Sequence, residues 1–400
     1  MKYITLLYDG MADYPVEALG GETPMSAAKT PYMDALCKNS VVGLAKTVPD
    51  GYPAGSDVAN LSMMGYDPTE CYTGRSPLEA ASMGLTLNGD DLAFRCNTVT
   101  LSDDEPYDKK VMIDYSAGDI SSAEASEIID SVQKEFGKSP YSFHSGVSYR
   151  HCMLLSGGCS SLEKFIPPHD ISDKVIGDYL SSAPANAPFM KMMRESYALL
   201  KNHPVNIERV KNGKRPANSI WLWGEGTKPR LQSFKDKTGL SGAVVSAVDL
   251  IKGIGQCAEM TVCDVEGATG YIDTNFEGKA KAALESLKSC DYVYIHVEAP
   301  DECGHRGEVQ NKVRSIELID ERLLRILLDG LKTYNDYKIL IAPDHPTPLS
   351  TKTHARDAVP FLIYHKNGHV SGPEKLTELS AKGGIYVDKA HSLLDMMLEG

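Results

Sequence analysis

Long apolar segments and paired cysteines are absent from this sequence of 400 residues. Because there is no run of about 18 consecutive apolar residues, we do not expect a membrane-spanning helix. The nine cysteines are an odd number and include no CxxC pair. They therefore indicate neither a disulfide framework nor a cysteine-rich zinc site. Scattered free cysteines are typical of a reducing compartment, so the sequence predicts a cytoplasmic protein.

Excess positive charge and the common nucleotide-binding motifs are absent as well. The net charge of −13 argues against a nucleic-acid partner, although a local basic patch could still hold a small anion. Neither GxxxxGK[ST] nor GxGxxG occurs, so ATP and NAD sites of those kinds have no support. The N-terminal run 3–8 is followed by Asp9 and Asp13 instead of a small-residue cleavage site. It predicts a first strand and not a signal peptide.

Apolar strand patterns alternate with helical patterns at both ends of the chain. This alternation predicts an α/β fold with a mostly parallel sheet covered by helices on both faces. Between about residues 90 and 217 the sequence pattern changes. It predicts strands and amphipathic helices that are separated by segments containing Pro, Gly and Ser. We therefore expect a discontinuous α/β domain formed by 1–89 and 218–400, with a smaller α+β domain inserted at 90–217.

Polar side chains cluster just beyond several predicted strands. The segment HVEAPDECGH continues an apolar run, and similar clusters follow or precede three other strands. Because function in α/β proteins is found at the carboxyl edge of the sheet, we expect these groups to converge there. They are three carboxylates and three imidazoles: Asp9, Asp301, His305, Asp344, His345 and His354.

Six such groups are too many for one tetrahedral zinc and suit two ions that share a site. Mixed Asp and His ligands favour Mn²⁺ or Zn²⁺ over Ca²⁺. Two-metal sites typically serve phosphate chemistry, which requires a nucleophile. Ser56, in PAGSDVANLSMMG, lies between a glycine-containing loop and a predicted helix, where a helix N-terminus favours a phosphate. The alternative interpretation of Ser56 is a plain helix N-cap.

Four motifs together resemble the alkaline phosphatase superfamily, and within it the archaeal-type cofactor-independent phosphoglycerate mutases. The similarity extends through further segments and covers nearly the whole chain, including YTGRSPLEAASMG, FRCNTV, VDLIKGIG and GATGYIDTN. The four motifs are DGMAD at 9–13, GSDVANLSMMGYDP at 55–68, EAPDECGH at 298–305 and APDHPTP at 342–348.

The resemblance implies a phosphatase-like domain with two metal ions and an inserted domain that grips the substrate. One ion would be held by Asp301, His305 and His354, and Ser56 would carry the phosphoryl group. The other ion would be held by Asp9, Ser56, Asp344 and His345. In the family, certain residues bind the phosphate and the carboxylate of the substrate. The positions that resemble them in this chain are Arg75, Arg150 and Lys252. Mn²⁺ is the first candidate for both ions, with Zn²⁺ and Mg²⁺ as alternatives. The basic segment 209–216 could add positive charge that binds the substrate.

The implied activity is the interconversion of 3- and 2-phosphoglycerate through phosphoserine, without 2,3-bisphosphoglycerate and without a nucleotide. The expected partner is a small phosphorylated metabolite. Trp223 in SIWLWGEG stands where the family often has Arg, and the region around Ser156 is less basic than expected. These departures leave open two alternatives: a homoserine kinase branch of the same family, and a metal-dependent phosphomonoesterase.

Overall fold

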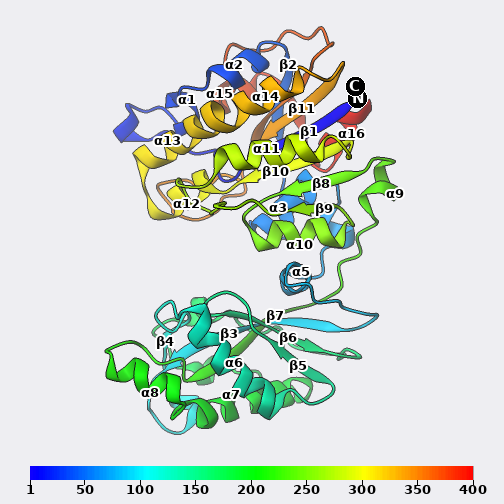
Figure 1. Ribbon diagram of the computed structural model, residues 1–400. Coiled ribbons are helices and arrows are strands. Elements are labelled where there is room, and N and C mark those ends of the chain that lie inside the picture. Colours follow the sequence, from blue (N-terminus) through cyan, green and yellow to red (C-terminus); the bar gives the residue numbers. More distant parts are fainter. Residues whose placement is uncertain (400) are drawn as a thin grey trace. The chain divides into compact units, whose positions relative to one another are not determined.

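The chain forms two compact units in a computed structural model that describes residues 1–399. The larger unit is made of Met1–Tyr72 with Arg230–Gly400, and the smaller unit is Thr73–Pro229 (Figure 1). Among the described residues, no helix combines the length and the apolar character needed to span a bilayer.

The two units differ from the predicted domains at both chain crossings. The boundaries lie after Tyr72 and Pro229, whereas the sequence pattern placed them after residues 89 and 217. Residues 73–89 belong to the smaller unit because their helix packs on its sheet, where Ala80 and Leu87 join a buried cluster with Ala93 and Cys152. The strand that ends the insertion also continues past the predicted crossing, to Thr227.

The larger unit is built on an eight-stranded sheet in the order β13-β2-β12-β11-β1-β10-β8-β9. Five of its strand pairs are parallel, and only the two pairs that β12 makes are antiparallel. The predicted α/β fold with a mostly parallel sheet is therefore confirmed. The strands are β1 (Lys2–Tyr8), β2 (Ser40–Ala45), β8 (Gly242–Val245), β9 (Thr261–Cys263), β10 (Tyr292–Val297), β11 (Tyr337–Ala342), β12 (Val359–His365) and β13 (Ile385–Val387).

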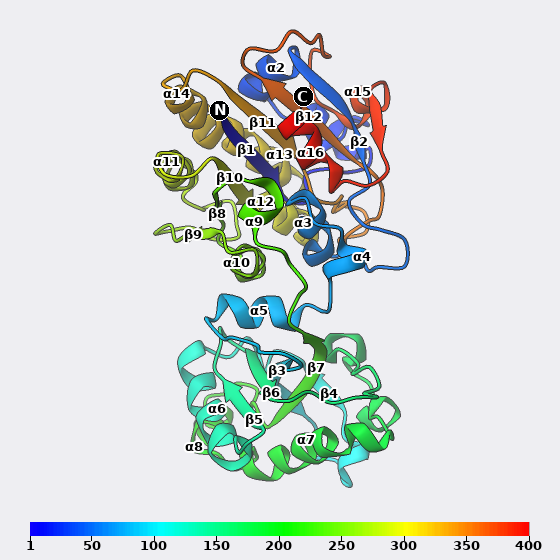
Figure 2. The same ribbon diagram turned by 90° about the vertical axis from the view of Figure 1, so that its right-hand side faces the viewer.

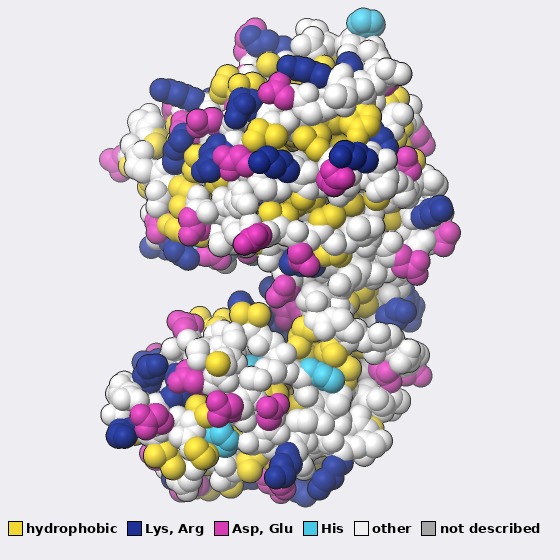
Figure 3. Space-filling model, viewed as in Figure 1, with side chains coloured by type: hydrophobic (Ala, Val, Ile, Leu, Met, Phe, Trp, Pro, Cys, Tyr) yellow, Lys and Arg dark blue, Asp and Glu magenta, His cyan; other side chains and the backbone are white. Residues whose placement is uncertain are grey.

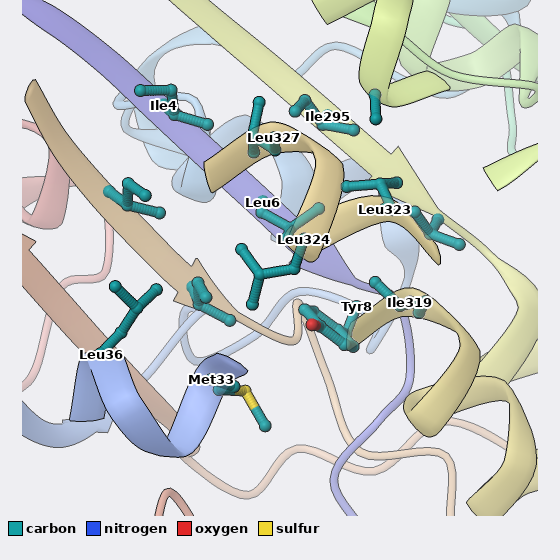
Figure 4. Close-up of a cluster of buried hydrophobic side chains, with 14 of the residues drawn as sticks. Ile4, Leu6, Tyr8, Met33, Leu36, Ile295, Ile319, Leu323, Leu324 and Leu327 are labelled. Atoms are coloured by element: carbon teal, nitrogen blue, oxygen red, sulfur yellow. The ribbon is translucent and has the colours of Figure 1, made fainter. Parts of the chain in front are cut away.

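Both faces of this sheet are covered by helices, which explains why its central strands are apolar throughout. Alternate residues of β1 and β10, such as Ile4, Leu6 and Ile295, pack in one large core (Figure 4). The helices over that face are α1 (Pro24–Ala27), α2 (Pro31–Cys37), α11 (Phe276–Ser286), α13 (Val309–Leu318), the π-helix η6 (Ile319–Leu324), α14 (Arg325–Leu331) and α15 (Glu378–Lys382).

The other alternate residues of the central strands face a second layer of helices. Tyr292 stacks on Phe234, and the Tyr294 hydroxyl donates to Asn60 at 2.6 Å. The layer consists of α3 (Ser56–Met63), α9 (Phe234–Thr238), α10 (Asp249–Cys257) and α16 (Ser392–Glu399), while α4 (Pro68–Cys71) follows α3 and α12 (Ala299–Arg306) follows β10 (Figure 2).

The smaller unit is an α+β layer structure around the long strand β3 (Leu92–Leu101). β3 pairs antiparallel with β4, β6 and β7, and β5 extends the sheet beyond β6. Its core contains Phe94, Phe189 and Trp221. The other elements are α5 (Ser76–Ser82), β4 (Met112–Asp114), α6 (Ser122–Phe136), β5 (Tyr141–His144), β6 (Arg150–Leu155), α7 (Ala187–Leu200), α8 (Pro204–Lys211) and β7 (Ser219–Thr227).

Charges of both signs are interspersed on the surface of the larger unit. On the face drawn in Figure 3, Lys and Arg side chains alternate with Asp and Glu and with apolar side chains. That face thus carries no broad positive surface of the kind that nucleic acids require.

A buried ion pair fastens the loop after β1 to the loop after β11. Lys312 of α13 donates to Asp13 Oδ2 at 2.7 Å and to the Thr347 carbonyl at 2.7 Å. The Asp13 carboxylate also accepts the backbone N–H of Leu349. Both charged side chains are at most 1% exposed, so neither has water as an alternative partner.

We expect Lys312→Met to lower the free energy of unfolding by about 3–5 kcal/mol, because it leaves Asp13 as an uncompensated buried charge. The matched control is Lys332→Met, which removes an exposed partner of Asp329 and should change stability by less than about 1 kcal/mol. Urea unfolding of the three proteins measures both values. Equal stability of the two variants would contradict the role given to the buried pair.

Candidate active site

The first group of site residues follows the carboxyl ends of neighbouring parallel strands. Asp9 follows β1 directly, and Asp344 and His345 follow β11. Because β1 lies between β11 and β10 and is parallel to both, the three strand ends meet at one edge. His345 Nε2 is 3.6 Å from Asp9 Oδ1 and 3.3 Å from Asp344 Oδ2. All three residues are buried.

Asp301, His305 and His354 form a second group at the same edge. Asp301 and His305 are four residues apart in α12 and therefore project from one face of that helix. His305 Nε2 is 3.2 Å from Asp301 Oδ2, and His354 Nε2 is 3.4 Å from Asp301 Oδ1. The groups adjoin, since ligand atoms of Asp9, Asp301 and His345 all lie within 4.8 Å of one another. The predicted convergence is thus present in the structure.

Ser56 joins this site from the opposite layer of helices. It is the first residue of α3, and its Oγ lies 3.1 Å from His345 Nε2. The N-cap of α3 is Gly55, with no side-chain hydrogen bond at the cap. Ser56 is therefore not a plain N-cap, and its hydroxyl faces the carboxylates and imidazoles.

Gly10 allows the loops of the site to approach each other closely. Its φ of +62° is in the left-handed region, and a Cβ at this position would lie 2.6 Å from both Asp301 Oδ1 and Thr347 Oγ1. A side chain at residue 10 would therefore displace Asp301 and Thr347.

In each of the three predicted imidazoles, Nδ1 contacts an oxygen atom of the protein. Nδ1 of His305 lies 3.0 Å from the Lys352 carbonyl, and Nδ1 of His354 lies 3.1 Å from the Ala54 carbonyl. Nδ1 of His345 lies 3.2 Å from Thr347 Oγ1. A carbonyl only accepts, so Nδ1 of His305 and of His354 carries the proton. Nε2 is then directed into the site, as in metal-ligating histidines whose other nitrogen is held by the protein.

The electrostatics of the site reflect three carboxylates in a small buried volume. Burial, and next the Asp344 and Asp301 carboxylates, raise the pKa of Asp9 well above its ordinary value. Burial opposes ionisation of Asp301 too, but its contacts with the imidazoles hold its pKa well below the usual range. The contact with Asp301 raises the pKa of His305 to about 9.

These donors fit divalent metal ions. The Nε2 atoms of His305 and His354 are only 2.9 Å apart, and both face Asp301, an arrangement that requires a cation or a proton between them. Asp9 Oδ1 is buried without a hydrogen-bond partner. Carboxylate and imidazole donors in this mixture match Mn²⁺ and Zn²⁺ better than Ca²⁺.

Known proteins resemble this chain along its full length. A family model described as 2,3-bisphosphoglycerate-independent phosphoglycerate mutase matches residues 37–206. A protein of Geobacter sulfurreducens named as a probable 2,3-bisphosphoglycerate-independent phosphoglycerate mutase is 50% identical, and the mutase of that name from Methanosarcina barkeri is 48% identical. Both matches cover 100% of each chain. The chain belongs to this mutase family.

Solved structures agree with the family assignment. A protein of Pyrococcus horikoshii is 30% identical, with a TM-score of 0.83, over 100% of this chain and 96% of that one. The cofactor-independent phosphoglycerate mutase of Thermoplasma acidophilum is 27% identical, with a TM-score of 0.67, over 100% and 99% of the two chains. The resemblance inferred from the sequence motifs is confirmed at the level of the mutase family.

A cluster of arginines lies in the smaller unit of this mutase-family chain. Arg75 Nε is 2.8 Å from Glu79 Oε1, and Arg95 Nε is 2.9 Å from Glu79 Oε2. Burial alone would raise the pKa of Glu79, but the surrounding guanidinium groups, Arg150 among them, lower it. Three guanidinium groups around one carboxylate leave an excess of positive charge, which suits an anionic ligand.

Trp223 supports this cluster. The Arg95 guanidinium lies 4.3 Å from the centre of the Trp223 ring, and the indole N–H donates to Asn97 at 2.9 Å. The Trp that replaces an expected Arg therefore holds another Arg by a cation–π contact. Sequence reasoning missed Arg95 because it lies inside strand β3, and the segment FRCNTV was interpreted only as a strand and as part of the family resemblance.

Lys252 and three of the four cations in the basic segment 209–216 pair with carboxylates of their own units. Lys252 of α10 lies in the larger unit and pairs with Asp264 at 2.7 Å. In the basic segment 209–216, Arg209 is buried and pairs with Glu124, and Arg215 pairs with Asp114. Arg209 thus holds α8, and Arg215 holds the segment that follows α8, to other parts of the smaller unit, which argues against the substrate grip considered for that segment.

Two further polar residues of the site were missed from the sequence. Asn60, one turn after Ser56 in α3, donates to the Ser56 carbonyl and to Asp344 Oδ2 at 2.7 Å. His296 lies inside β10, with Nε2 2.9 Å from Asp9 Oδ2, and burial lowers the pKa of its imidazole to about 3. The only signal for Asn60 was its i+4 spacing from Ser56, and His296 was hidden in an apolar strand pattern.

We expect Mn²⁺ to stabilise the metal-free protein, by about 2.7 kcal/mol at a free concentration 100 times the dissociation constant. A chelator should reverse the shift. His354→Ala should weaken the effect because it removes one donor of the Asp301 group. His365→Ala is the matched control, since it removes an imidazole that pairs with Asp336 and is not among the candidate ligands. Thermal unfolding with and without Mn²⁺ tests this, and an unchanged shift in His354→Ala would contradict the ligand assignment.

Proposed function

We propose that this protein interconverts 3- and 2-phosphoglycerate through a phosphoserine on Ser56, independently of 2,3-bisphosphoglycerate. The observation that carries the proposal is the position of the Ser56 hydroxyl, at a helix N-terminus and 3.1 Å from His345 Nε2 in a dense cluster of metal-binding side chains. Full-length similarity to proteins named as this mutase supports the choice of reaction.

The seven residues divide into two ion-binding groups in this proposal. Asp301, His305 and His354 hold one ion, and the other is held by Asp9, Ser56, Asp344 and His345. Bound divalent ions lower the pKa of a hydroxyl and neutralise phosphoryl oxygens. Mn²⁺ is the first candidate from the donor types, with Zn²⁺ and Mg²⁺ as alternatives.

The chain itself positions the nucleophile. The N-terminus of α3 directs backbone N–H groups toward a phosphoryl group that approaches Ser56, which favours the negative charge there. Asn60 ties the Ser56 carbonyl to Asp344, so the nucleophile and the carboxylate keep a fixed separation. A nucleophile held in this way loses less conformational freedom when the substrate binds.

The reaction then consists of two transfers. Ser56 Oγ attacks phosphorus, the bond from Oγ to phosphorus forms, and the bond from phosphorus to the C3 oxygen breaks. The proton lost by Ser56 balances the one gained by the C3 oxygen. The 2-hydroxyl of the retained glycerate next attacks phosphoserine and releases Ser56 with the same proton balance. No nucleotide takes part.

We further propose that the arginine cluster of the smaller unit grips the substrate. Arg75 and Arg150 lie around Glu79 with Arg95, and their planar guanidinium groups suit the carboxylate and phosphate of phosphoglycerate. Lys252 remains a proposed contributor from the larger unit. The partner is accordingly a small phosphorylated metabolite, and the nine free cysteines of the described chain support a reducing, cytoplasmic location.

We expect Ser56→Ala to abolish isomerisation of 3-phosphoglycerate in an assay with Mn²⁺ and without 2,3-bisphosphoglycerate or ATP. The reason is that no other group stores the phosphoryl group between the two transfers. Ser62→Ala is the control in the same helix, because its hydroxyl bonds the Thr47 carbonyl. It should cost only about 1 kcal/mol of stability and keep the activity. Phosphohomoserine formed from ATP and homoserine, or free phosphate alone, would contradict the substrate assignment.

Arg150→Met should raise KM for 3-phosphoglycerate by roughly 10- to 100-fold, because a charge-assisted hydrogen bond contributes about 1.5–3 kcal/mol. Lys191→Met is the control in the same unit, since this lysine is exposed and pairs with Glu195. Its KM should match that of the unaltered protein. Steady-state kinetics of both variants decide the point, and an unchanged KM in Arg150→Met would remove that residue from the proposed grip.

A further inference from the structure

His296 is a buried imidazole on the strand face that is directed toward the site. Along β10, Val293, Ile295 and Val297 pack in the large core, whereas Tyr294 and His296 project to the opposite face. Tyr294 reaches Asn60 on that face. His296 lies two residues nearer the carboxyl end of the strand, which is the end at which Asp9 lies. Its side chain is 0% exposed, and its imidazole contacts Asp9.

The contact between His296 and Asp9 is close but is not a well-directed hydrogen bond. His296 Nε2 lies 2.9 Å from Asp9 Oδ2, yet this nitrogen has no hydrogen-bond partner of acceptable geometry, and neither has Asp9 Oδ1. Two buried, unpartnered polar atoms in one cluster are costly unless a further group lies between them. One ligand atom from each of Asp9, His296 and Asp344 lies within 4.8 Å of the other two.

The other ring nitrogen of His296 is held as in the three predicted ligands. His296 Nδ1 lies 3.3 Å from Ser246 Oγ, which itself accepts the backbone N–H of Val248 at 3.0 Å. In the tautomer in which Nδ1 donates to this hydroxyl, Nε2 has a lone pair that faces the Asp9 carboxylate. A lone pair and a carboxylate attract each other only through a cation or a proton between them.

We propose that His296 is a fourth metal-ligating histidine, whose Nε2 binds a divalent cation of the Mn²⁺ or Zn²⁺ class together with Asp9 and Asp344. This inference adds one ligand to the proposed metal centre and rests on that proposal. Asp9 presents Oδ2 to His296 and Oδ1 to His345. The Asp9 carboxylate therefore has an imidazole beside each oxygen. His296 supplies the metal ligand on the side of the centre that faces β10.

Crystals of the full chain loaded with Zn²⁺ test the proposal directly. An anomalous-difference map at the zinc edge should place an ion about 2.0–2.1 Å from His296 Nε2. Ions bound only by the seven residues of the proposed centre, with His296 Nε2 outside coordination distance, would overturn the inference and leave the proposed function intact. A map without ions at any of these residues would contradict the proposed metal centre itself.

Two variants separate ligation from mere positioning. Calorimetric titration of metal-free protein with Zn²⁺ should show affinity at one site weakened at least about tenfold in His296→Ala and in His296→Gln. Gln can donate a hydrogen bond to Asp9 but supplies no imidazole nitrogen, so retained affinity in His296→Gln would reduce His296 to a positioning residue. His365→Ala should titrate like the unaltered protein. If His296→Ala fails to fold, the Gln variant and the crystal experiment still decide.

Discussion

Three carboxylates that cannot all be charged without compensation determine the design of this site. Asp9, Asp301 and Asp344 are buried at adjacent strand ends, where like charges interact strongly and water does not screen them. The buried ammonium groups nearby are engaged otherwise, because Lys279 donates to the His296 carbonyl and Lys312 to Asp13. The imidazoles beside Asp301 compensate part of this charge, and the ions of the proposed centre would compensate the rest.

The surrounding fold holds these groups together against their mutual repulsion. Parallel pairing of β1 with β10 and β11 fixes the strand ends, and the buried pair of Lys312 and Asp13 fixes the loops beyond them. On the opposite side, Asn60 accepts from the Tyr294 hydroxyl while it donates to Asp344, which ties α3 to the sheet. The positions of these donor atoms are thus set by hydrogen bonds and strand pairing within the chain.

Much of this site could be predicted because its residues interrupt clear apolar patterns. Asp9, Asp344 and His345 each follow a strand that reads as buried, and Asp301 and His305 have helical i, i+4 spacing. His296 and Arg95 could not be found in this way, since each lies within a strand and its role depends on which face meets a distant segment. The first domain boundary was misplaced because the turn-rich stretch near residue 89 connects α5 to β3 inside the smaller unit, while the short segment 73–75 that precedes α5 marks the crossing itself.

The backbone carbonyls that orient two of the histidines have an evolutionary consequence. His305 and His354 are oriented by the carbonyls of Lys352 and Ala54, which belong to the backbone and are present whatever side chain occupies those positions. Residue 54 can therefore change its side chain while the imidazole of His354 keeps its direction, whereas residue 352, with a φ of +55°, is restricted by its left-handed backbone. Insertions or deletions that move the backbone would displace both imidazoles. Because Ala54 is two residues before Ser56, the loop that carries the nucleophile is under this length constraint. Families descended from such a centre should vary in side chains around it far more than in loop length.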